Sequence, residues 1–449
     1  MKETLDIAIV GGGMAGAALA LLLSKRLPAL SIALLEQHPL PSGNQAQLAV
    51  PSFDARSTAL AFSTRNILQE IAVWEALSAY AQPILQVHVS ERQQALGMLM
   101  RAEEVDLPAL GYVIENRVLG QVLLQALQQQ AGIAIYDNTQ VHNLVLAAQV
   151  AQLLTRHADG EEKTLRAKLV VIADGAQSAL RQRLGIAVDE QPYEQHALIA
   201  NVVTELPHGA VAYERFTENG PVALLPLLDC ENKHRAALIW TLPDKEIDAV
   251  MQLSEAEFLQ RLQTQLGNRC GRVLSVGARF CYPLSLVQAR EQVRTRIVLA
   301  GSAAHHLHPV AGQGFNLIMR DCLALVETLE KALAEQCDIG ALPVLQQYLV
   351  QQQWDQQKTV KASDWLPRLF SNRHTPHKLL RSAALLGLDF LPGMRELFAR
   401  EASRFMSEMF DIVIVGGGMH WLRAGLCNMD THYKIAMIDK SNAANIFSG

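Results

Sequence analysis

Three glycines near the start of the chain have the spacing of a nucleotide-binding turn. Gly11, Gly13 and Gly16 follow a short apolar run and precede a stretch rich in alanine and leucine. The first glycine permits a tight turn, the second lets the backbone approach a pyrophosphate, and the third lets helix and strand pack closely. Glu36 ends the next apolar run, 20 residues after Gly16, where an acid binds a ribose hydroxyl. The sequence therefore predicts a dinucleotide site at a helix N-terminus.

A second glycine-rich segment lies at residues 301–316. It follows an apolar run, and Gly312 and Gly314 precede the next helical stretch. This order predicts another helix N-terminus, whose amides could stabilise negative charge such as a reduced flavin carries near N1 and O2. Pro309 would stiffen the approach, and Asn316 could cap the helix or contact a ring.

Apolar periodicity predicts the elements that would hold these residues. Strands are expected at residues 5–10, 31–36, 133–136, 141–155, 168–172, 210–216, 222–227, 236–241 and 296–300. Helices are expected at residues 14–26, 64–80, 117–130 and 314–333, and over most of 341–405. Nucleotide-type signals near residues 10, 174 and 301 are thus separated by β-rich segments. This pattern predicts a discontinuous nucleotide-binding domain that carries an inserted, sheet-rich domain.

Taken together, the motifs resemble the FAD-dependent aromatic hydroxylases, the family that includes para-hydroxybenzoate hydroxylase. The segments that carry the resemblance are residues 11–16 with Glu36, 54–60, 173–181 and 301–321. The run Tyr-Glu-Arg-Phe-Thr at residues 213–217, with the Gly-Pro and Leu-Leu-Pro that follow, resembles the ubiquinone-biosynthesis branch. The resemblance extends over about residues 4–405. It implies an α/β fold with a Rossmann-like, discontinuous FAD-binding domain, an inserted β-sheet substrate domain and C-terminal helices.

The resemblance also implies the chemistry. FAD is bound without covalent attachment and is reduced by NAD(P)H. The reduced flavin reacts with O2 to give a C4a-hydroperoxide, whose distal oxygen passes to the ring of a prenylated phenol. The implied cofactor-binding residues are Gly11, Gly13, Gly16, Glu36, Arg56, Arg117, Asp174, Gly175, Gly301, Ser302, Gly314, Phe315 and Asn316. The implied catalytic residues beside the reacting ring are His305, Pro309, Gly312 and Gln313.

One position departs from the family pattern. Ser302 stands where the family usually has aspartate, and a hydroxyl can form hydrogen bonds but carries no charge. We therefore expect weaker FAD binding at this position, without loss of the site.

Three histidines, His305, His306 and His308, lie in the 301–316 segment. They lack a carboxylate at the spacing of a zinc protease, so we expect no metal. A neutral imidazole suits deprotonation of a phenol near pH 7, whereas packing within the loop would give these side chains a structural role. The sequence leaves both interpretations open.

We expect four parts in the chain. The FAD-binding domain comprises residues 1–80, 101–190 and 280–340, and the substrate domain comprises residues 81–100 and 191–279. Residues 341–408 form a helical region. Residues 409–449 are a degenerate partial repeat, because the sequence of residues 6–14 recurs almost unchanged at 411–419 but Trp421 replaces Gly16. An indole there would hold helix and strand apart, so we expect no second nucleotide site.

Composition excludes several classes of protein. Of 449 residues, 50% are hydrophobic and 18% are charged, with a net charge of −5, which excludes a disordered chain and disfavours nucleic-acid binding. The six cysteines contain no C-x-x-C pair and favour reduced thiols in a cytoplasmic protein. A poorly soluble substrate predicts contact with the inner-membrane surface, for which apolar residues 379–397 are a candidate, and contact with other ubiquinone-biosynthesis enzymes. For residues 379–397 themselves, an ordinary packed helix pair is the favoured interpretation.

Two other functions compete with the monooxygenase. One is another flavin oxidoreductase of the same fold, such as a halogenase or a prenyl reductase. The five tryptophans include no W-x-W pair of the kind that related halogenases use, which disfavours halogenation. The other is a non-catalytic FAD-binding scaffold of a quinone-biosynthesis assembly, which Ser302 and the repeat alone support.

Overall fold

A computed structural model describes residues 4–40, 56–91, 97–268, 270–306 and 313–371, and two short strands at 412–415 and 435–438. The helices in these ranges are α1 (Met14–Arg26), α2 (Phe62–Glu70), α3 (Trp74–Ser78), α4 (Asn116–Gln128), α5 (Ala179–Arg183), α6 (Asp244–Met251), α7 (Glu255–Leu266), α8 (Gln313–Ala334) and α9 (Leu342–Ser371). Short 3-10 turns occur at η1 (Ala102–Val105) and η2 (Gly301–Ala303). None of these helices is long and apolar enough to cross a membrane.

The first sheet places the nucleotide-type motifs at one edge. Its strands are β1 (Leu5–Val10), β2 (Ile32–Leu35), β8 (Ile133–Tyr136), β9 (Thr139–Leu146), β10 (Ala151–His157), β11 (Glu162–Ile172), β18 (Val293–Arg294) and β19 (Ile297–Leu299). In the order β19-β11-β1-β2-β8 all neighbours are parallel, so their carboxyl ends meet at one edge. Gly11, Glu36, Ala173 and Ala300 directly follow β1, β2, β11 and β19 at that edge.

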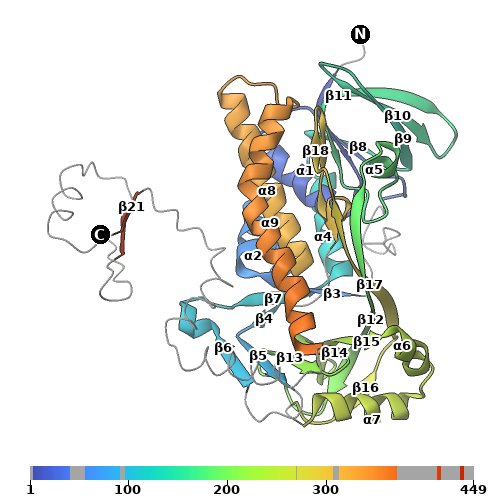
Figure 1. Ribbon diagram of the computed structural model, residues 1–449, viewed down its shortest axis with the longest axis vertical. Helices are drawn as coiled ribbons and strands as arrows, with labels where there is room; N and C mark the ends of the chain where they lie inside the picture. The colour runs from blue at the N-terminus through green and yellow to red at the C-terminus, as the bar shows by residue number, and fades with distance from the viewer. Residues whose placement is uncertain are drawn as a thin grey trace. The chain divides into compact units, whose positions relative to one another are not determined.

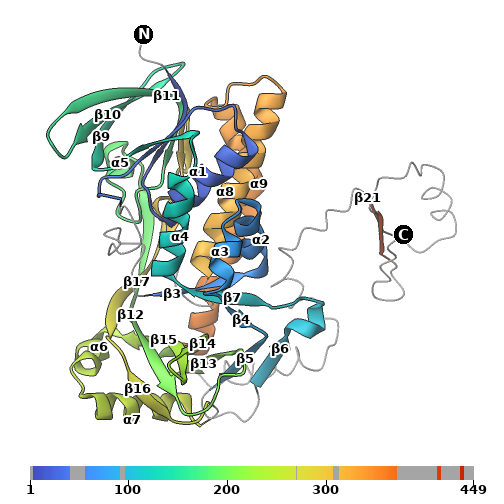
Figure 2. The ribbon, with the colours of Figure 1, turned by 180° about the vertical axis from the view of Figure 1, so that it is seen from behind.

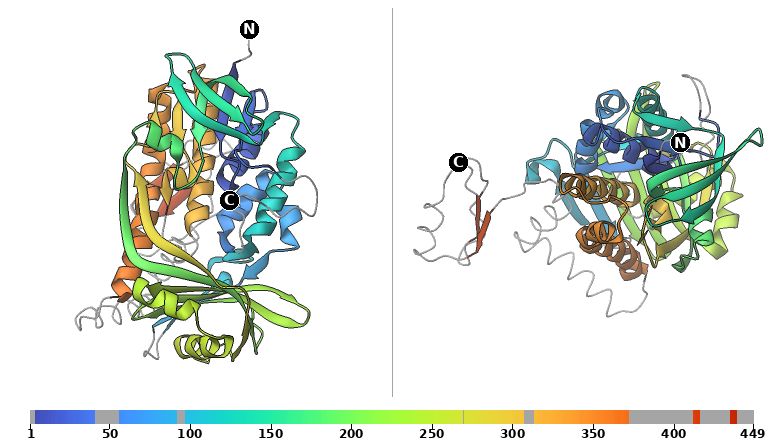
Figure 3. Two further views of the ribbon diagram at one scale, coloured as in Figure 1. Left: turned by 90° about the vertical axis from the view of Figure 1, so that its right-hand side faces the viewer. Right: turned by 90° about the horizontal axis from the view of Figure 1, so that it is seen from above.

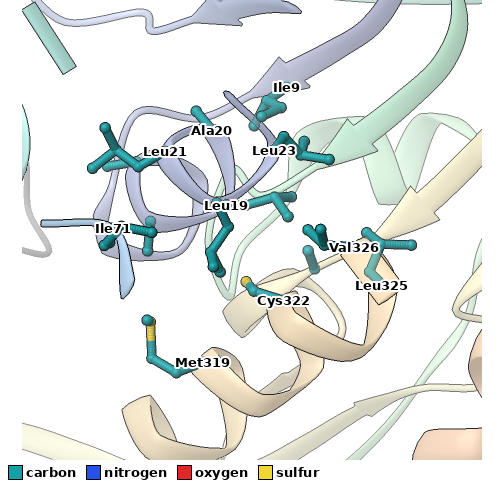
Figure 4. Packing of buried hydrophobic residues seen from close by; sticks show 14 of the residues in the cluster. Ile9, Leu19, Ala20, Leu21, Leu23, Ile71, Met319, Cys322, Leu325 and Val326 are labelled. Carbon is teal, nitrogen blue, oxygen red and sulfur yellow. The ribbon is translucent and has the colours of Figure 1, made fainter. Parts of the chain in front are cut away.

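Helices α1, α4 and α8 cover one face of the first sheet (Figures 1 and 2). Leu19 and Leu23 of α1 are fully buried and pack with Cys322 and Val326 of α8 (Figure 4). Full burial of one aliphatic side chain contributes about 1.5–3 kcal/mol, so this interface fixes α1 firmly on the sheet. The β9–β10 hairpin and α5 cover the opposite face.

The second sheet forms the other half of the molecule's core. Its strands are β5 (Gln86–Glu91), β6 (Gly97–Arg101), β12 (Val188–Thr204), β13 (Val211–Thr217), β14 (Gly220–Cys230), β15 (Lys233–Pro243), β16 (Val273–Val276), β17 (Phe280–Ala289) and β20 (His305–His306). The order is β20-β17-β12-β15-β14-β13-β5-β6, with β16 beside β12. The helices α6 and α7 cover one of its faces. The long antiparallel strands β12 and β17 run from beside the first sheet into the second (Figure 3).

A small third sheet lies between the two. It has the order β3-β7-β4, from β3 (Ser57–Ala61), β7 (Gly111–Glu115) and β4 (Gln82–Ile84). After the second sheet is built, the chain returns to the first through β18 and β19. The α/β fold with an interrupted nucleotide-binding sheet, an inserted sheet and C-terminal helices is therefore confirmed.

Several expected elements differ from the structure. The single helix expected at residues 64–80 is wrong: α2 ends at Glu70 and α3 begins at Trp74, because Ala72 adopts a left-handed conformation with φ of 57°. The expected stretch at 141–155 is a hairpin of two strands. The region between residues 190 and 285 also contains α6 and α7, which were not predicted. The expected helical region beyond residue 371 lies outside the described residues.

Residues 384–449 form a separate unit. In it, β21 (Ile412–Val415) pairs in parallel with β22 (Ile435–Ile438), as β1 pairs with β2. The repeat thus reproduces the first strand pair of the nucleotide-binding turn. Trp421 lies outside the described residues.

Candidate functional site

A cavity of about 430 Å³ lies between the carboxyl edge of the first sheet and the second sheet. Its two sides differ in chemistry. The side toward the first sheet is lined by polar groups and exposed backbone, from Gly11, Gly13, Glu36, Arg56, Asp174, Gly175 and Ser302. The side toward the second sheet is lined mainly by apolar side chains, including Ala197, Ile199, Leu225, Ile239, Tyr282 and Leu284. The structure therefore brings most of the predicted site residues together at one hollow.

The glycine turn is packed too tightly for any side chain. Gly11 has a φ of 110°, and a Cβ there would lie 2.4 Å from the carbonyl oxygen of Ala173. A Cβ at Gly16 would lie 1.9 Å from the carbonyl oxygen of Gly11. Gly16 does not line the cavity, so its role is the close packing of α1 on β1. These contacts hold the start of α1 at the carboxyl edge of the sheet.

The N-terminus of α1 faces the cavity. Gly13 is its N-cap residue and offers no capping side chain, and the first turn contains no acid. Gly13, Met14 and Ala15 all line the cavity. The backbone amides and the positive end of the helix dipole therefore face the cavity, and these are the groups that bind a pyrophosphate.

Glu36 is fixed by two backbone amides. One carboxylate oxygen accepts a hydrogen bond from the Gly12 amide at 2.7 Å, and the other accepts one from the His38 amide at 2.9 Å. The residue is 5% exposed and lines the cavity. Each carboxylate oxygen has a further lone pair, so Glu36 can also accept from a ligand hydroxyl.

The two predicted arginines differ in position. Arg56 lines the cavity, and its guanidinium lies 4.9 Å from the centre of the Tyr282 ring. Arg117 is exposed on α4 and does not line the cavity. Its neighbour Asn116 does line it and accepts a hydrogen bond from the Thr58 hydroxyl at 2.5 Å. Sequence reasoning missed Asn116, although it stands at the start of a strongly amphipathic helix.

Asp174 presents an unsatisfied oxygen. Its Oδ1 is buried and has no hydrogen-bond partner among the described residues. Burial raises the pKa of this carboxyl, although nearby donors partly oppose the shift. Gly175, which follows, has a φ of 96° and open space where a side chain would stand. The pair leaves room and an acceptor for a ligand hydroxyl or amide.

Arg181 joins two loops of the site. Its guanidinium donates to the carbonyl of Ala303 at 2.8 Å and to the carbonyl of Ala176 at 2.9 Å. The residue is 4% exposed. Arg181 thereby ties the segment after β11 to the η2 turn. The sequence motif includes Arg181, but this positioning role was not predicted from it.

The η2 turn approaches α1 closely. Gly301 has a φ of 62°, and a Cβ there would lie 2.7 Å from the Cβ of Ala15. Ser302 follows and lines the cavity. The turn that carries Ser302 therefore lies beside the N-terminus of α1.

His305 and His306 extend the second sheet as β20, paired with β17. His305 is 3% exposed, and its Nε2 lies 2.5 Å from an oxygen of Asp321 on α8. The other oxygen of Asp321 accepts from the Gln356 amide at 3.0 Å. The Nδ1 of His305 is buried without a partner among the described residues. His306 also lines the cavity, where burial and then the charge of Arg56 lower its pKa.

The start of α8 completes this end of the cavity. Gly314 and Phe315 line it. Asn316 does not line the cavity. Its side-chain oxygen Oδ1 accepts hydrogen bonds from the Ala61 amide at 2.8 Å and from the Thr64 hydroxyl at 2.7 Å. The Asn316 side chain therefore ties α8 to the β3–α2 segment. Pro309, Gly312 and His308 lie outside the described residues, and for Gln313 only the backbone, at the start of α8, is described.

The residues present fit a flavin dinucleotide. Three buried polar atoms have no partner among the described residues, namely Ser57 Oγ, Asp174 Oδ1 and His305 Nδ1. They belong to residues that line the same cavity as the helix amides. A ligand rich in hydroxyl, phosphate and ring donors and acceptors would satisfy them. Among the described residues, no group of three His, Cys, Asp or Glu side chains could hold a metal ion.

The comparison with known proteins decides the family. A family model described as "FAD binding domain" matches residues 4–348. The chain belongs to this family. It is a flavin monooxygenase with FAD as cofactor.

Relatives and solved structures agree with this assignment. The ubiquinone hydroxylase UbiL of Rhodospirillum rubrum is 32% identical over 403 residues, covering 88% of this chain and 89% of the relative. The 3-demethoxyubiquinol 3-hydroxylase of Escherichia coli is 32% identical over 397 residues, covering 86% and 95%. The p-nitrophenol 4-monooxygenase PnpA of Pseudomonas putida has the same fold, with a TM-score of 0.71, 18% identity, and coverage of 91% of this chain and 100% of that one.

Proposed function

We propose that this protein hydroxylates the aromatic ring of a prenylated phenol in ubiquinone biosynthesis, with NAD(P)H and O2 as co-substrates. One observation carries the proposal: a single cavity joins a polar, nucleotide-type side to an apolar side on the second sheet. The relatives named as ubiquinone hydroxylases support the pathway. The sequence motifs also resemble those of 2-octaprenyl-6-methoxyphenol hydroxylase.

On the polar side, the chain's own residues would hold FAD. The amides at the start of α1 would bind the pyrophosphate, Glu36 a ribose hydroxyl, and Asp174 and Ser302 further polar atoms of the cofactor. Arg56 would balance the phosphate charge. When bound, reduced FAD supplies the electrons that activate O2.

On the apolar side, the second sheet would bind the phenol. Ile199, Leu225 and Ile239 present aliphatic surface, and Tyr282 adds a ring. Such a wall excludes water from the reacting ring and accepts apolar substituents. Charged aromatic acids would be disfavoured against it, which agrees with a prenylated, uncharged substrate.

His305 would hold or transfer a proton at the flavin end of the cavity. The contact with Asp321 fixes the orientation of the imidazole through Nε2, and Nδ1 is left to donate to, or accept from, a bound group. We retain Pro309, Gly312 and Gln313 as proposed neighbours of the reacting ring.

Peripheral membrane contact and association with other biosynthetic enzymes also remain proposals. The apolar segment at residues 379–397 lies outside the described residues. The poor solubility of a long prenyl chain is the argument for both.

The test is substrate-stimulated NAD(P)H oxidation. We expect a short-tailed prenyl-methoxyphenol to accelerate NAD(P)H and O2 consumption by the FAD-loaded protein and to yield a hydroxylated ring. The matched control is 4-hydroxybenzoate, whose carboxylate the apolar wall should reject. A preference for the acid, or FAD binding without stimulation by any prenylated phenol, would contradict the proposal.

A further inference from the structure

Glu214 lies on the same face of the second sheet as the apolar wall of the cavity. Pairing across the sheet places Ile199, Ile239, Ala223 and Glu214 opposite one another in one row, on β12, β15, β14 and β13. Ile199 and Ile239 line the cavity. Neighbouring strands are about 4.8 Å apart, so the Cα of Glu214 lies about 10 Å from that of Ile239 along the row.

This face of the sheet is more open than the other. Ala223 and Ile239 are only half-buried, whereas Leu224 and Trp240, which follow them on the opposite face, are buried under α6 and α7. Glu214 is half-buried as well. The helix α9 reaches across β13 and β14 beside it (Figure 1). The row therefore runs from the cavity wall at Ile199 and Ile239, past the last lining residues, toward the strands that α9 contacts.

Within the part of the chain that the structure describes, no hydrogen bond or ion pair holds the carboxyl of Glu214. Its neighbours in the row, Ala223 and Val89, are apolar. Burial alone raises the pKa of Glu214 to about 7. An acid whose charged form is disfavoured by its surroundings, beside the wall of a cavity, is typical of groups that act on a ligand.

We propose that Glu214 is the polar anchor of the aromatic substrate and forms a hydrogen bond with its ring hydroxyl. This inference rests on the proposed function, since it assumes a phenolic substrate against this wall. A Glu side chain and a substituted ring together span the distance from Glu214 to Ile239. The apolar surroundings strengthen such a bond and make its loss costly.

The anchor sets the orientation of the ring. With its hydroxyl at Glu214, the ring must lie along the row toward Ile239 and the flavin end of the cavity. His305 lies at the flavin end, beside α8 and away from Glu214. Glu214 would thus act on the substrate, whereas His305 would act near the cofactor.

The test combines two variants with two ligands. Glu214→Leu removes the polar group at similar volume, and Glu214→Gln keeps hydrogen bonding without the charge. Glu218→Gln, at an exposed carboxyl just beyond β13, is the matched control. The ligands are a short-tailed prenyl-methoxyphenol and its O-methyl ether, and the dissociation constant of each is measured by flavin absorbance.

We expect wild type and E218Q to bind the phenol at least fivefold more tightly than the ether. E214L should bind both equally, and E214Q should retain part of the difference. E214L should also unfold at a higher temperature than wild type and bind FAD normally, because a carboxylate that is poorly solvated in the folded state is removed.

Two results would overturn the inference. One is an E214L variant that still prefers the phenol as wild type does. The other is an E214L variant that is less stable than wild type, which would show a structural role. A wild-type protein that prefers neither prenylated ligand over 4-hydroxybenzoate would contradict the proposed function itself. That result concerns the wild type and can be told apart from the two E214L results.

Discussion

Gly16 illustrates how single residues determine this site. Its missing side chain lets α1 start directly against β1, with the carbonyl of Gly11 where a Cβ would stand. The turn thereby presents amides rather than side chains to a phosphate. Glu36, Asp174 and His305 then contribute polar atoms that the fold has fixed in place but not fully satisfied.

Replacement of Gly16 by alanine should therefore abolish FAD binding. The added methyl would lie 1.9 Å from a backbone oxygen, so helix and strand must separate, at a cost of about 1–3 kcal/mol in unfolding free energy. Bound FAD per chain and the melting temperature measure both effects. Gly132→Ala is the control, since its nearest contact is the Ser24 hydroxyl at 3.8 Å. A G16A variant that retains stoichiometric FAD would contradict the account.

Glu214 should make stability depend on pH. Its pKa rises from 4.5 to about 7 on folding, so between these values the native state holds a proton that the unfolded state has lost. Stability therefore falls as pH rises through this window, by up to about 3 kcal/mol, and the loss is complete above about pH 7.

The variant E214Q removes this dependence. In urea unfolding, the stability gained by E214Q over wild type should be larger at pH 8 than at pH 5. The E218Q variant should run parallel to wild type. A gain that stays constant with pH would show that Glu214 has an ordinary pKa in the native state.

At the scale of elements, the sequence predicted what depends on local pattern. The strands at residues 5–10 and 133–136 and the helix at 14–26 occur as expected, because an apolar run or a periodic one without breakers determines them. The split between α2 and α3 depends on one left-handed alanine, which no residue preference signals. The capping box Ser254–Glu257 was available in the sequence and would have revealed α7.

The sequence predicted the site residues that belong to local motifs, as it predicted the elements with a clear local pattern. Motif residues that follow strands came together, because parallel strands share one carboxyl edge. The sequence does not distinguish Asn116 from Arg117 as the residue that faces the cavity. The packing of α4 decides which of these two neighbours faces inward. The contact between His305 and Asp321 and the apolar wall from the second sheet depend on packing between distant segments, and no local signal exists for either.

Arg181 connects two of these elements, and its loss should loosen the site. In Arg181→Met the carbonyls of Ala176 and Ala303 lose their donor in a buried setting, which should cost about 2–4 kcal/mol of unfolding free energy. FAD affinity should fall as well, because the loops after β11 and β19 are no longer tied together. Arg183→Gln, at an exposed position of the same short helix, should change neither quantity. Unaltered FAD affinity in R181M would refute this positioning role.

At the scale of the whole molecule, the two large sheets form different sides of the site. The first sheet offers the nucleotide-binding edge, the second offers an apolar wall, and β12 and β17 join them. The cavity between them is therefore defined by the long strands rather than by a single loop. In the separate unit at residues 384–449, the two described strands repeat one strand pair of the first sheet.

Removal of residues 409–449 should leave FAD binding intact. The repeat replaces Gly16 by Trp421 and provides no counterpart of Asp174. We expect one FAD per chain in both the full-length and the shortened protein, measured by flavin absorbance after denaturation. A decrease from two to one would show that the repeat is a working nucleotide site.

The most direct test of monooxygenation is the source of the new oxygen. The FAD-loaded protein is incubated with NAD(P)H and a short-tailed prenyl-methoxyphenol under ¹⁸O₂, and the product is examined by mass spectrometry. The account predicts one labelled oxygen on the aromatic ring, in proportion to the NAD(P)H consumed. Oxidation of NAD(P)H to peroxide alone, or a product whose new oxygen is unlabelled, would contradict it.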